Sequence, residues 1–355
     1  MKKERIATLD FLRGIAVLLM VQQHTGYWFW KSGGSMSALL PKYPVMVTVN
    51  GLGALAAPLF IGLAGAGAAM SYHSGRSGRE MFFRGIMLMM SGYLLNFLTP
   101  AWFAPWSWYV LHLIGFSICI SPVLKKISSP LLLFFALLII VFTVLLLNHY
   151  SMPRYYSNSF MREACGLAAM LKVAAFKGNF PIFPWFALFM LGFVSGRWVT
   201  GHMYNRILKA ALVILAAALL LFAMKSAELP FVNYSPVRRL FIVNLYMFPA
   251  YPVQFMTLSA VTLLSIYLAL RASARLTVSG SNIVVLLGRA SLTVFMLHII
   301  IIRNFMVASG LWQSFSTVTT VLLQLAVIGF ITLLVYFWRK ADFKYGFEWL
   351  LRLVK

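Results

Sequence analysis

The chain has 355 residues, of which 61% are hydrophobic and only 10% are charged. Water-soluble domains carry about 25% charged residues, so this composition excludes a soluble globular protein and indicates one that is solvated by the membrane. The net charge of +23 does not indicate nucleic-acid binding, because Lys and Arg lie in short clusters between apolar runs. The two cysteines, Cys119 and Cys165, lack metal-ligand spacing, and we expect no metal site.

Apolar runs of about 18 to 22 residues follow one another along the chain, each long enough to cross a bilayer as a helix. They predict an all-α, polytopic membrane protein with about ten transmembrane helices. No long polar segment or internal repeat divides the sequence, so we expect a single domain over residues 1–355. The predicted spans are residues 9–30, 52–72, 81–98, 104–123, 130–147, 182–199, 208–224, 251–270, 283–302 and 317–338.

The distribution of positive charge predicts the orientation. The first span follows a basic N-terminus, as a signal peptide would, but it contains charged residues and lacks a small-residue cleavage site, so we expect it to be retained. With the N-terminus inside, 20 of the 30 Lys and Arg fall on cytoplasmic segments or on the cytoplasmic ends of the predicted spans. We therefore expect a multi-pass protein of the inner (cytoplasmic) cell membrane with both termini in the cytoplasm.

The first span carries three side chains that are costly in lipid: Asp10, Arg13 and His24. Arg13 and His24 are 11 residues apart, which brings them within about 20° of the same helix face and separates them by roughly 16 Å along the axis. Asp10, three residues before Arg13, lies on the same stripe. A distance of this size matches an extended pantetheine arm, with an anionic head at Arg13 and a thioester near His24.

A structural explanation of the same residues stays open. Arg13 could be an anchor at the inner surface, paired with Asp10, and His24 a buried histidine bonded to a carbonyl group. The neighbouring Gln22, Gln23 and Thr25 favour a hydrated cavity, because they make this part of the span unusually polar.

The segment LDFLRG, with Arg13 followed after ten residues by His24, resembles the first-helix signature of the acyltransferase type 3 family. Five later segments look like bacterial relatives of heparan-alpha-glucosaminide N-acetyltransferase. They are APLFIGLAGAGAAMS at 57–71, FFRGIMLMMSGYLLNF at 82–97, VLHLIGFS at 110–117, FPWFALFMLGFVSGR at 183–197 and LGRASLTVFMLH at 287–298.

The resemblance implies a transmembrane acyltransferase that moves an acetyl or other acyl group from cytoplasmic acyl-CoA to a carbohydrate acceptor on the far side. Two positions depart from the heparan enzyme's close relatives. Ala54 stands where an acidic residue often precedes the proline of the PLF segment, and His24 stands where Asn is common. These two differences leave the acceptor and the exact catalytic base open, and nothing in the sequence names the acyl chain.

For catalysis we expect His24 to act as general base, since an imidazole can remove a proton from an acceptor hydroxyl or amine. An acyl-histidine intermediate is the alternative. Asp10 is the second catalytic candidate. Arginine forks suit the phosphates of coenzyme A, and Arg13, Arg84 and Arg289 are the candidates near the inner surface.

Three further polar residues inside predicted spans are candidates for substrate binding: Asn96, His112 and His298. For the two histidines a structural hydrogen bond between helices is the alternative, and for Asn96 a cap at the helix end. The expected partners are the lipid bilayer, acetyl-CoA or another acyl-CoA, and a glycan or other extracytoplasmic acceptor.

A secondary transporter or flippase is the main alternative function, because spans with buried His and Arg also describe proton-coupled carriers. The sequence has no pair of similar halves and no matched broken helices, and its polar residues concentrate in the first span. A non-catalytic scaffold would have no need of Asp10, Arg13 and His24 on one stripe. The lack of repeated halves argues against the transporter and the polar stripe argues against the scaffold, so the sequence favours an enzyme.

Overall fold

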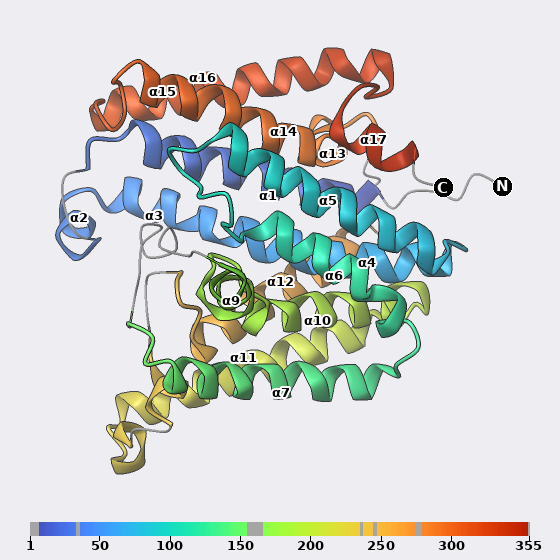
Figure 1. Ribbon diagram of the computed structural model, residues 1–355, viewed down its shortest axis with the longest axis vertical. Coiled ribbons are helices and arrows are strands. Elements are labelled where there is room, and N and C mark those ends of the chain that lie inside the picture. The colour runs from blue at the N-terminus through green and yellow to red at the C-terminus, as the bar shows by residue number, and fades with distance from the viewer. Residues whose placement is uncertain are drawn as a thin grey trace. The chain divides into compact units, whose positions relative to one another are not determined.

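The computed structural model describes residues 7–32, 36–154, 166–234, 237–243, 247–273 and 279–353. These residues form helices joined by short connections, and no β-strand occurs among them, which confirms the all-α prediction (Figure 1). An isolated bridge between Trp30 and Phe315 is the exception. Cys165 lies outside the described residues.

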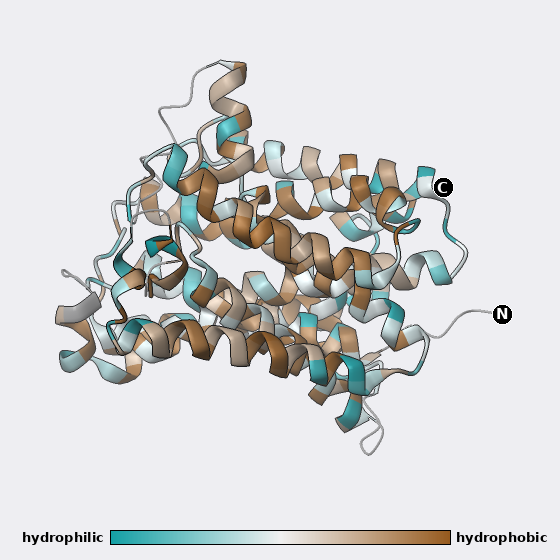
Figure 2. Ribbon diagram, turned by 90° about the horizontal axis from the view of Figure 1, so that it is seen from below, coloured by the Kyte–Doolittle hydropathy of each residue, from teal (hydrophilic) through white to brown (hydrophobic). Residues whose placement is uncertain are grey.

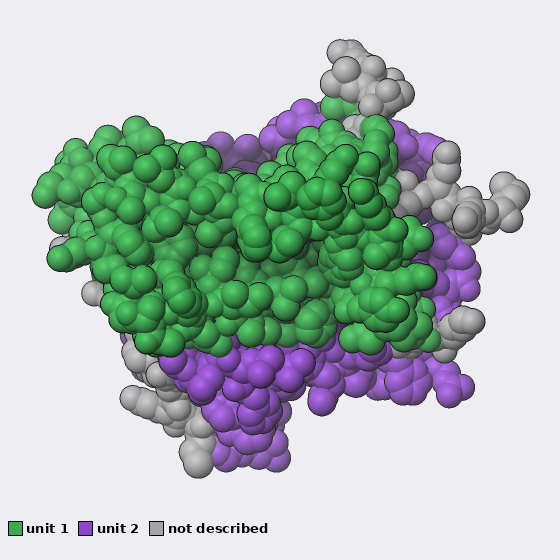
Figure 3. Space-filling model, turned by 90° about the horizontal axis from the view of Figure 1, so that it is seen from above, with its two compact units in different colours: residues 1–60, 271–353, 355 green, residues 61–270, 354 purple. Residues whose placement is uncertain are grey.

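The chain divides into two compact units, which Figure 3 shows in different colours. The first contains residues 1–60, 271–353 and 355, and the second contains residues 61–270 and 354. A single domain over the whole chain stays a prediction.

The first unit combines the two ends of the sequence. Its longest helices are α1 (Ala7–Phe29) and α16 (Thr317–Trp338), and shorter helices complete it. These are α2 (Met36–Lys42), α3 (Pro44–Leu52), η1 (Gly53–Leu55), the start of α4 (Ala56–His73), α13 (Ile283–Arg289), α14 (Ser291–His298), the π-helical turn η5 (Ile299–Arg303), α15 (Asn304–Ala308), η6 (Arg339–Ala341) and α17 (Phe347–Leu353).

Close contact between α1 and α13 holds the first unit together. A Cβ atom built on Gly14 would lie 1.9 Å from the carbonyl oxygen of Val284, and one built on Gly288 would lie 1.8 Å from that of Asp10. The two backbones can approach this closely only because both positions are glycine. At the other end of α1, backbone hydrogen bonds join Trp28 and Phe29 to residues 313 and 315. Both ends of α1 are therefore fixed.

The second unit is built around α10 (Ile182–Thr200), which is buried along most of its length. Arg197 of α10 donates hydrogen bonds to the carbonyl oxygens of Leu124, Lys125 and Ile127, at and just after the C-terminal end of α6 (Val110–Leu124). The other elements are the remainder of α4, α5 (Gly78–Leu98), α6 (Val110–Leu124), α7 (Ser129–His149), α9 (Leu167–Lys172), the π-helical turn η2 (Val173–Lys177), α11 (Tyr204–Ser226), η3 (Pro230–Asn233), η4 (Arg238–Phe241) and α12 (Pro252–Ser273).

Eight helical segments among the described residues are long and apolar enough to cross a membrane. Figure 2 shows the hydrophobic residues concentrated along the long helices. Two predicted spans are not among these eight segments. The first forms α1, whose polar side chains lower its mean hydropathy, and the fourth forms α6, which is shorter. The eight segments are Pro44–His73, Gly78–Leu98, Ser129–His149, Ile182–Thr200, Tyr204–Ser226, Pro252–Ser273, Ser291–Ala308 and Thr317–Ala341.

Three predicted boundaries were wrong. Residues 104–109 are not helical, so the fourth span begins at Val110. The second helical segment begins at Pro44 rather than residue 52, because 44–55 continue into α4. The span predicted at 283–302 is interrupted at Ala290, which has φ −100° and ψ 13°, and the apolar stretch after this break runs to Ala308. The non-helical stretch at 104–109 and the break at Ala290 lie in apolar sequence, where hydropathy does not distinguish a turn from a helix.

Candidate active site

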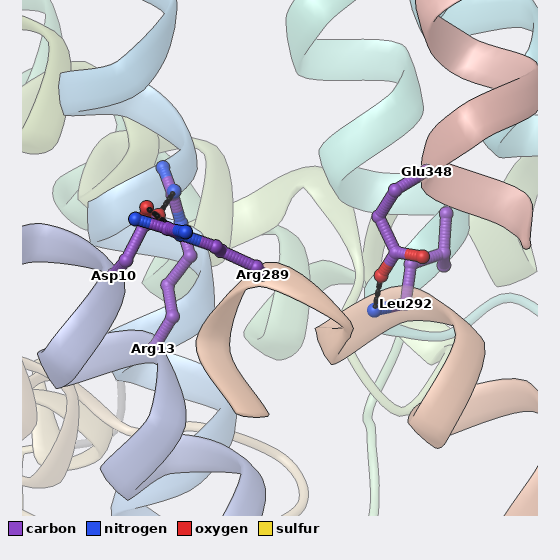
Figure 4. A network of polar contacts seen from close by, with 5 residues as sticks. All are labelled: Asp10, Arg13, Arg289, Leu292 and Glu348. Atoms are coloured by element: carbon purple, nitrogen blue, oxygen red, sulfur yellow. Dashed lines mark hydrogen bonds and ion pairs between the residues drawn. The ribbon is translucent and has the colours of Figure 1, made fainter. Parts of the chain in front are cut away.

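Asp10 lies between two arginines near the start of α1. Arg13 Nη1 is 2.7 Å from Asp10 Oδ1, and Arg289 Nε is 3.7 Å from Asp10 Oδ2 (Figure 4). The carboxylate is buried, whereas the side chains of both arginines are about one quarter exposed. Asp10 therefore contacts one arginine of its own helix and one arginine of α13.

The close contact of α1 with α13 explains why Arg289 belongs to this cluster. Arg289 is the last residue of α13 and follows Gly288, which touches the backbone of Asp10. The C-terminal end of a helix carries a partial negative charge and favours a cation. The sequence predicted Arg13 and Arg289 as separate candidates, and the structure brings them together on one carboxylate.

His24 and His298 form a hydrogen-bonded pair further along α1. His24 Nδ1 lies 2.9 Å from His298 Nε2, although the residues are 274 positions apart in the sequence. The two ring planes differ by 11°, and the ring centroids are 5.2 Å apart. This separation is close to the N···N distance plus two ring radii, so the rings lie edge to edge in nearly one plane. That is the geometry of a directed N–H···N hydrogen bond.

The opposite edge of the His298 ring is also fixed. His298 Nδ1 lies 2.7 Å from the carbonyl oxygen of Val294, one turn earlier in α14. His298 is the last residue of α14 and is buried, and the π-helical turn η5 begins directly after it. Such turns are rare and occur frequently at functional sites.

Trp28 covers both imidazoles. Its ring centroid lies 5.4 Å from that of His24 and 5.6 Å from that of His298, and its side chain is fully buried. It follows His24 by four residues in α1, which places both on the same helix face. The indole therefore packs against both members of the pair and restricts how the rings can tilt.

Amide side chains fill the neighbouring helix contacts. Gln22 Nε2 donates to Asn50 Oδ1 at 2.6 Å, and Gln324 Nε2 donates to the backbone oxygen of Gln22 at 2.7 Å. Sequence reasoning missed Asn50 and Gln324. The signal for Gln324 was available, because it is the only amide or charged side chain of the otherwise apolar α16. The polarity of Gln22, from which we predicted a hydrated cavity, is used in these contacts between helices.

The cation cluster, formed by Arg13 and Arg289 around Asp10, and the pair of His24 and His298 contact α1 at different levels along its axis. Arg13 and His24 are 11 residues apart, or roughly 16 Å along a continuous helix, and Asp10 and His24 are 14 residues apart, or roughly 21 Å. His24 therefore contacts His298 while Asp10 contacts the arginines. The predicted catalytic role of Asp10 stays a prediction.

Three sequence candidates belong to the second unit. Asn96 Nδ2 donates to the carbonyl oxygens of Pro105 and Ser107, both at 3.0 Å, which ties the loop before α6 to α5. Its Oδ1 is buried without a hydrogen-bond partner among the described residues. Arg84, in α5, is partly buried, and its Nε likewise has no partner in the described part of the chain.

His112 caps its own helix. Its Nδ1 accepts a hydrogen bond from the backbone amide of Tyr109 at 3.3 Å, and the ring is fully buried among Tyr93, Trp108 and Tyr109. This hydrogen bond lies within the first turn of α6, whereas the structural alternative considered from the sequence was a hydrogen bond between helices. Substrate binding by His112 and Asn96 stays a prediction.

The fold and the site define a multi-pass helical membrane protein in which Asp10, Arg13 and His24 of α1 contact Arg289 of α13 and His298 of α14. Family comparison identifies the chain more closely. The model of "heparan-alpha-glucosaminide N-acetyltransferase, catalytic" matches residues 5–231, and the model of "OpgC protein" matches residues 160–342. The chain belongs to the transmembrane acyltransferase group that contains these two families.

This membership confirms the resemblance seen in the sequence, and the protein is a transmembrane acyltransferase. The first matched region contains Arg13 and His24, and the second contains Arg289 and His298. The pair of histidines thus joins residues from both matched regions. No curated protein matches the chain.

Proposed function

We propose that the protein transfers an acyl group, in the first place acetyl, from cytoplasmic acyl-CoA to a carbohydrate acceptor on the other side of the membrane. The observation that carries this proposal is the arrangement along α1. Two arginines around Asp10 stand at one level, and the His24–His298 pair stands roughly 16 Å further along the same helix. A carbohydrate acceptor is supported by the name of the first matched family, which specifies a glucosaminide.

The cation cluster is assigned to the phosphates of the donor. Guanidinium groups bind phosphate oxygens through paired hydrogen bonds, and Arg13 and Arg289 are both partly exposed. Asp10 contacts both guanidinium groups and so orients both side chains. Phosphate binding by Arg84 of the second unit, whose Nε lacks a hydrogen-bond partner in the described residues, stays a prediction.

His24 is assigned to the transfer step. The acceptor's nitrogen or oxygen adds to the thioester carbonyl carbon while its proton passes to the imidazole of His24. The carbon–sulfur bond then breaks, and the thiolate of coenzyme A leaves with the proton that His24 returns. For this geometry both termini are cytoplasmic, so that the donor enters at the Arg13 level and the acceptor at the His24 level.

The test is acyl transfer by the purified protein in lipid nanodiscs, with acetyl-CoA as donor and p-nitrophenyl α-D-glucosaminide as probe acceptor. We expect His24→Ala and His24→Asn to lose about 10²- to 10⁴-fold in turnover while still binding acetyl-CoA. His149→Ala, which removes an exposed histidine of the second unit, is the matched control and should keep wild-type turnover. Near wild-type turnover in His24→Ala would return His24 to a packing role. In sealed proteoliposomes, uptake of the probe without release of coenzyme A would indicate a carrier instead.

A further inference from the structure

We infer that His298 is a positioning residue that holds the proton of His24 on Nδ1 and so makes Nε2 the basic nitrogen that serves in catalysis. The inference rests on the proposed function, because it concerns the same base. It goes beyond that proposal by assigning a specific role to a second histidine and by naming the atom of His24 that receives the acceptor's proton.

The hydrogen bond between His298 and the carbonyl group of Val294 fixes the position of the first proton. A carbonyl oxygen can only accept a hydrogen bond, so His298 Nδ1, 2.7 Å from Val294 O, must carry a proton and donate it. A neutral imidazole has one N–H and one acceptor nitrogen, and the neutral form is the less costly one inside an apolar span. His298 Nε2 is therefore an acceptor.

The direction of the second hydrogen bond follows. Because His298 Nε2 accepts, the donor across the 2.9 Å contact is the Nδ1–H group of His24. With its proton on Nδ1, neutral His24 carries its lone pair on Nε2, at the opposite side of the ring. If the two hydrogen bonds ran in the opposite direction, His298 Nδ1 would have no proton, and two acceptors, His298 Nδ1 and Val294 O, would face each other.

The surroundings keep this arrangement in place. Val294 lies one turn before His298 in α14, so the first hydrogen bond is set by helix geometry. Trp28 packs against both rings and restricts rotation of His24 about its side-chain bonds. The arrangement resembles the general pattern in which an acceptor behind a catalytic imidazole selects its tautomer. Here the acceptor is a second imidazole, anchored on a backbone carbonyl.

A direct test does not depend on activity. The protein with ¹⁵N-labelled histidine rings, in lipid nanodiscs, is examined by NMR, and His24→Ala and His298→Phe spectra assign the two residues among the six histidines. We expect His24 to be protonated at Nδ1 and unprotonated at Nε2, with an N–N coupling across the hydrogen bond to His298. A spectrum with His24 protonated at Nε2 would overturn the inference.

The functional test compares two substitutions at one position. His298→Phe keeps a flat ring but has no acceptor, so the His24 proton can move to Nε2, and kcat should fall by about 10²-fold or more with little change in acetyl-CoA affinity. His298→Gln offers a side-chain oxygen near the former Nε2 and should recover most of the loss. A merely structural role would lower thermal stability in both variants and leave the turnover of the folded fraction unchanged.

The outcomes separate this inference from the proposed function. Wild-type turnover in His298→Phe together with an inactive His24→Ala would overturn the role of His298 and leave His24 as the base. Full activity in His24→Ala would overturn both. Equal loss in His298→Phe and His298→Gln would contradict the tautomer argument, because the glutamine oxygen should replace the acceptor.

Discussion

Glu348 accepts hydrogen bonds from both the backbone amide and the hydroxyl group of Thr293, 55 residues earlier in the chain. It also accepts one from the amide of Leu292, so the α17 carboxyl group caps the first turn of α14 (Figure 4). The free amides of a helix start favour such an acceptor. Because α14 ends at His298, the C-terminal segment supports the helix that carries one member of the histidine pair.

Removing this cap should destabilise the first unit. Glu348→Ala leaves the amides of Leu292 and Thr293 without their acceptor, and caps of this kind contribute about 1 to 2 kcal/mol. We expect a lower thermal midpoint in nanodiscs, with Arg352→Ala, an exposed change on the same helix, as the control. Equal midpoints for the two variants would contradict a capping role.

The pKa of Glu348 is raised above 4.5, chiefly because burial disfavours the charged carboxylate, although its hydrogen bonds act in the opposite direction. The folded state therefore binds the proton more tightly than the unfolded state. Stability from this group is complete below pH about 4.5 and declines as the pH rises through the folded-state pKa. Glu348→Gln, which stays neutral, should flatten this part of the profile of thermal midpoint against pH. An unchanged profile would show that other groups produce it.

The arginine cluster predicts donor affinity. Arg13→Ala and Arg289→Ala should each weaken acetyl-CoA binding by roughly 10- to 100-fold, the equivalent of about 1.5 to 3 kcal/mol for a charged hydrogen bond. Calorimetry measures the affinity, and Lys340→Ala, an exposed cation of the same unit, is the control. Unchanged affinity in both arginine variants would move the donor site elsewhere.

Asp10→Asn separates two roles for the carboxyl group. If Asp10 holds the arginines, the variant weakens acetyl-CoA binding and turnover at saturating donor changes little. A loss confined to kcat, with donor affinity intact, would instead support the catalytic role that the sequence suggested.

Two glycine substitutions test the contact between α1 and α13. Gly14→Ala would place a Cβ atom 1.9 Å from Val284 O, which forces the helices apart, and such overpacking costs about 1 to 3 kcal/mol. Gly329→Ala in α16 is the matched control, because no heavy atom lies within 4 Å of the added carbon. We expect a lower thermal midpoint and weaker acetyl-CoA binding for Gly14→Ala alone. A similar response in both variants would mean that helix propensity, rather than packing, dominates.

Several features followed from the sequence because they depend only on composition and on position along one helix. Apolar length identified most of the membrane helices. Helical periodicity placed Asp10, Arg13 and His24 on one stripe of α1, and the Asp10–Arg13 contact at 2.7 Å is a local pair of the kind that a three-residue spacing permits. Local spacing is retained after folding, so these relationships could be read without a structure.

The partners of those residues required the tertiary structure. Nothing in the sequence relates His24 to His298, or Asp10 to Arg289, because these contacts depend on how closely α13 and α14 approach α1. That approach is decided by small residues such as Gly14 and Gly288, and by a helix break at Ala290 that hydropathy does not register. The sequence determined which side chains are costly in the membrane, whereas only packing between distant segments decided which polar group satisfies each of them.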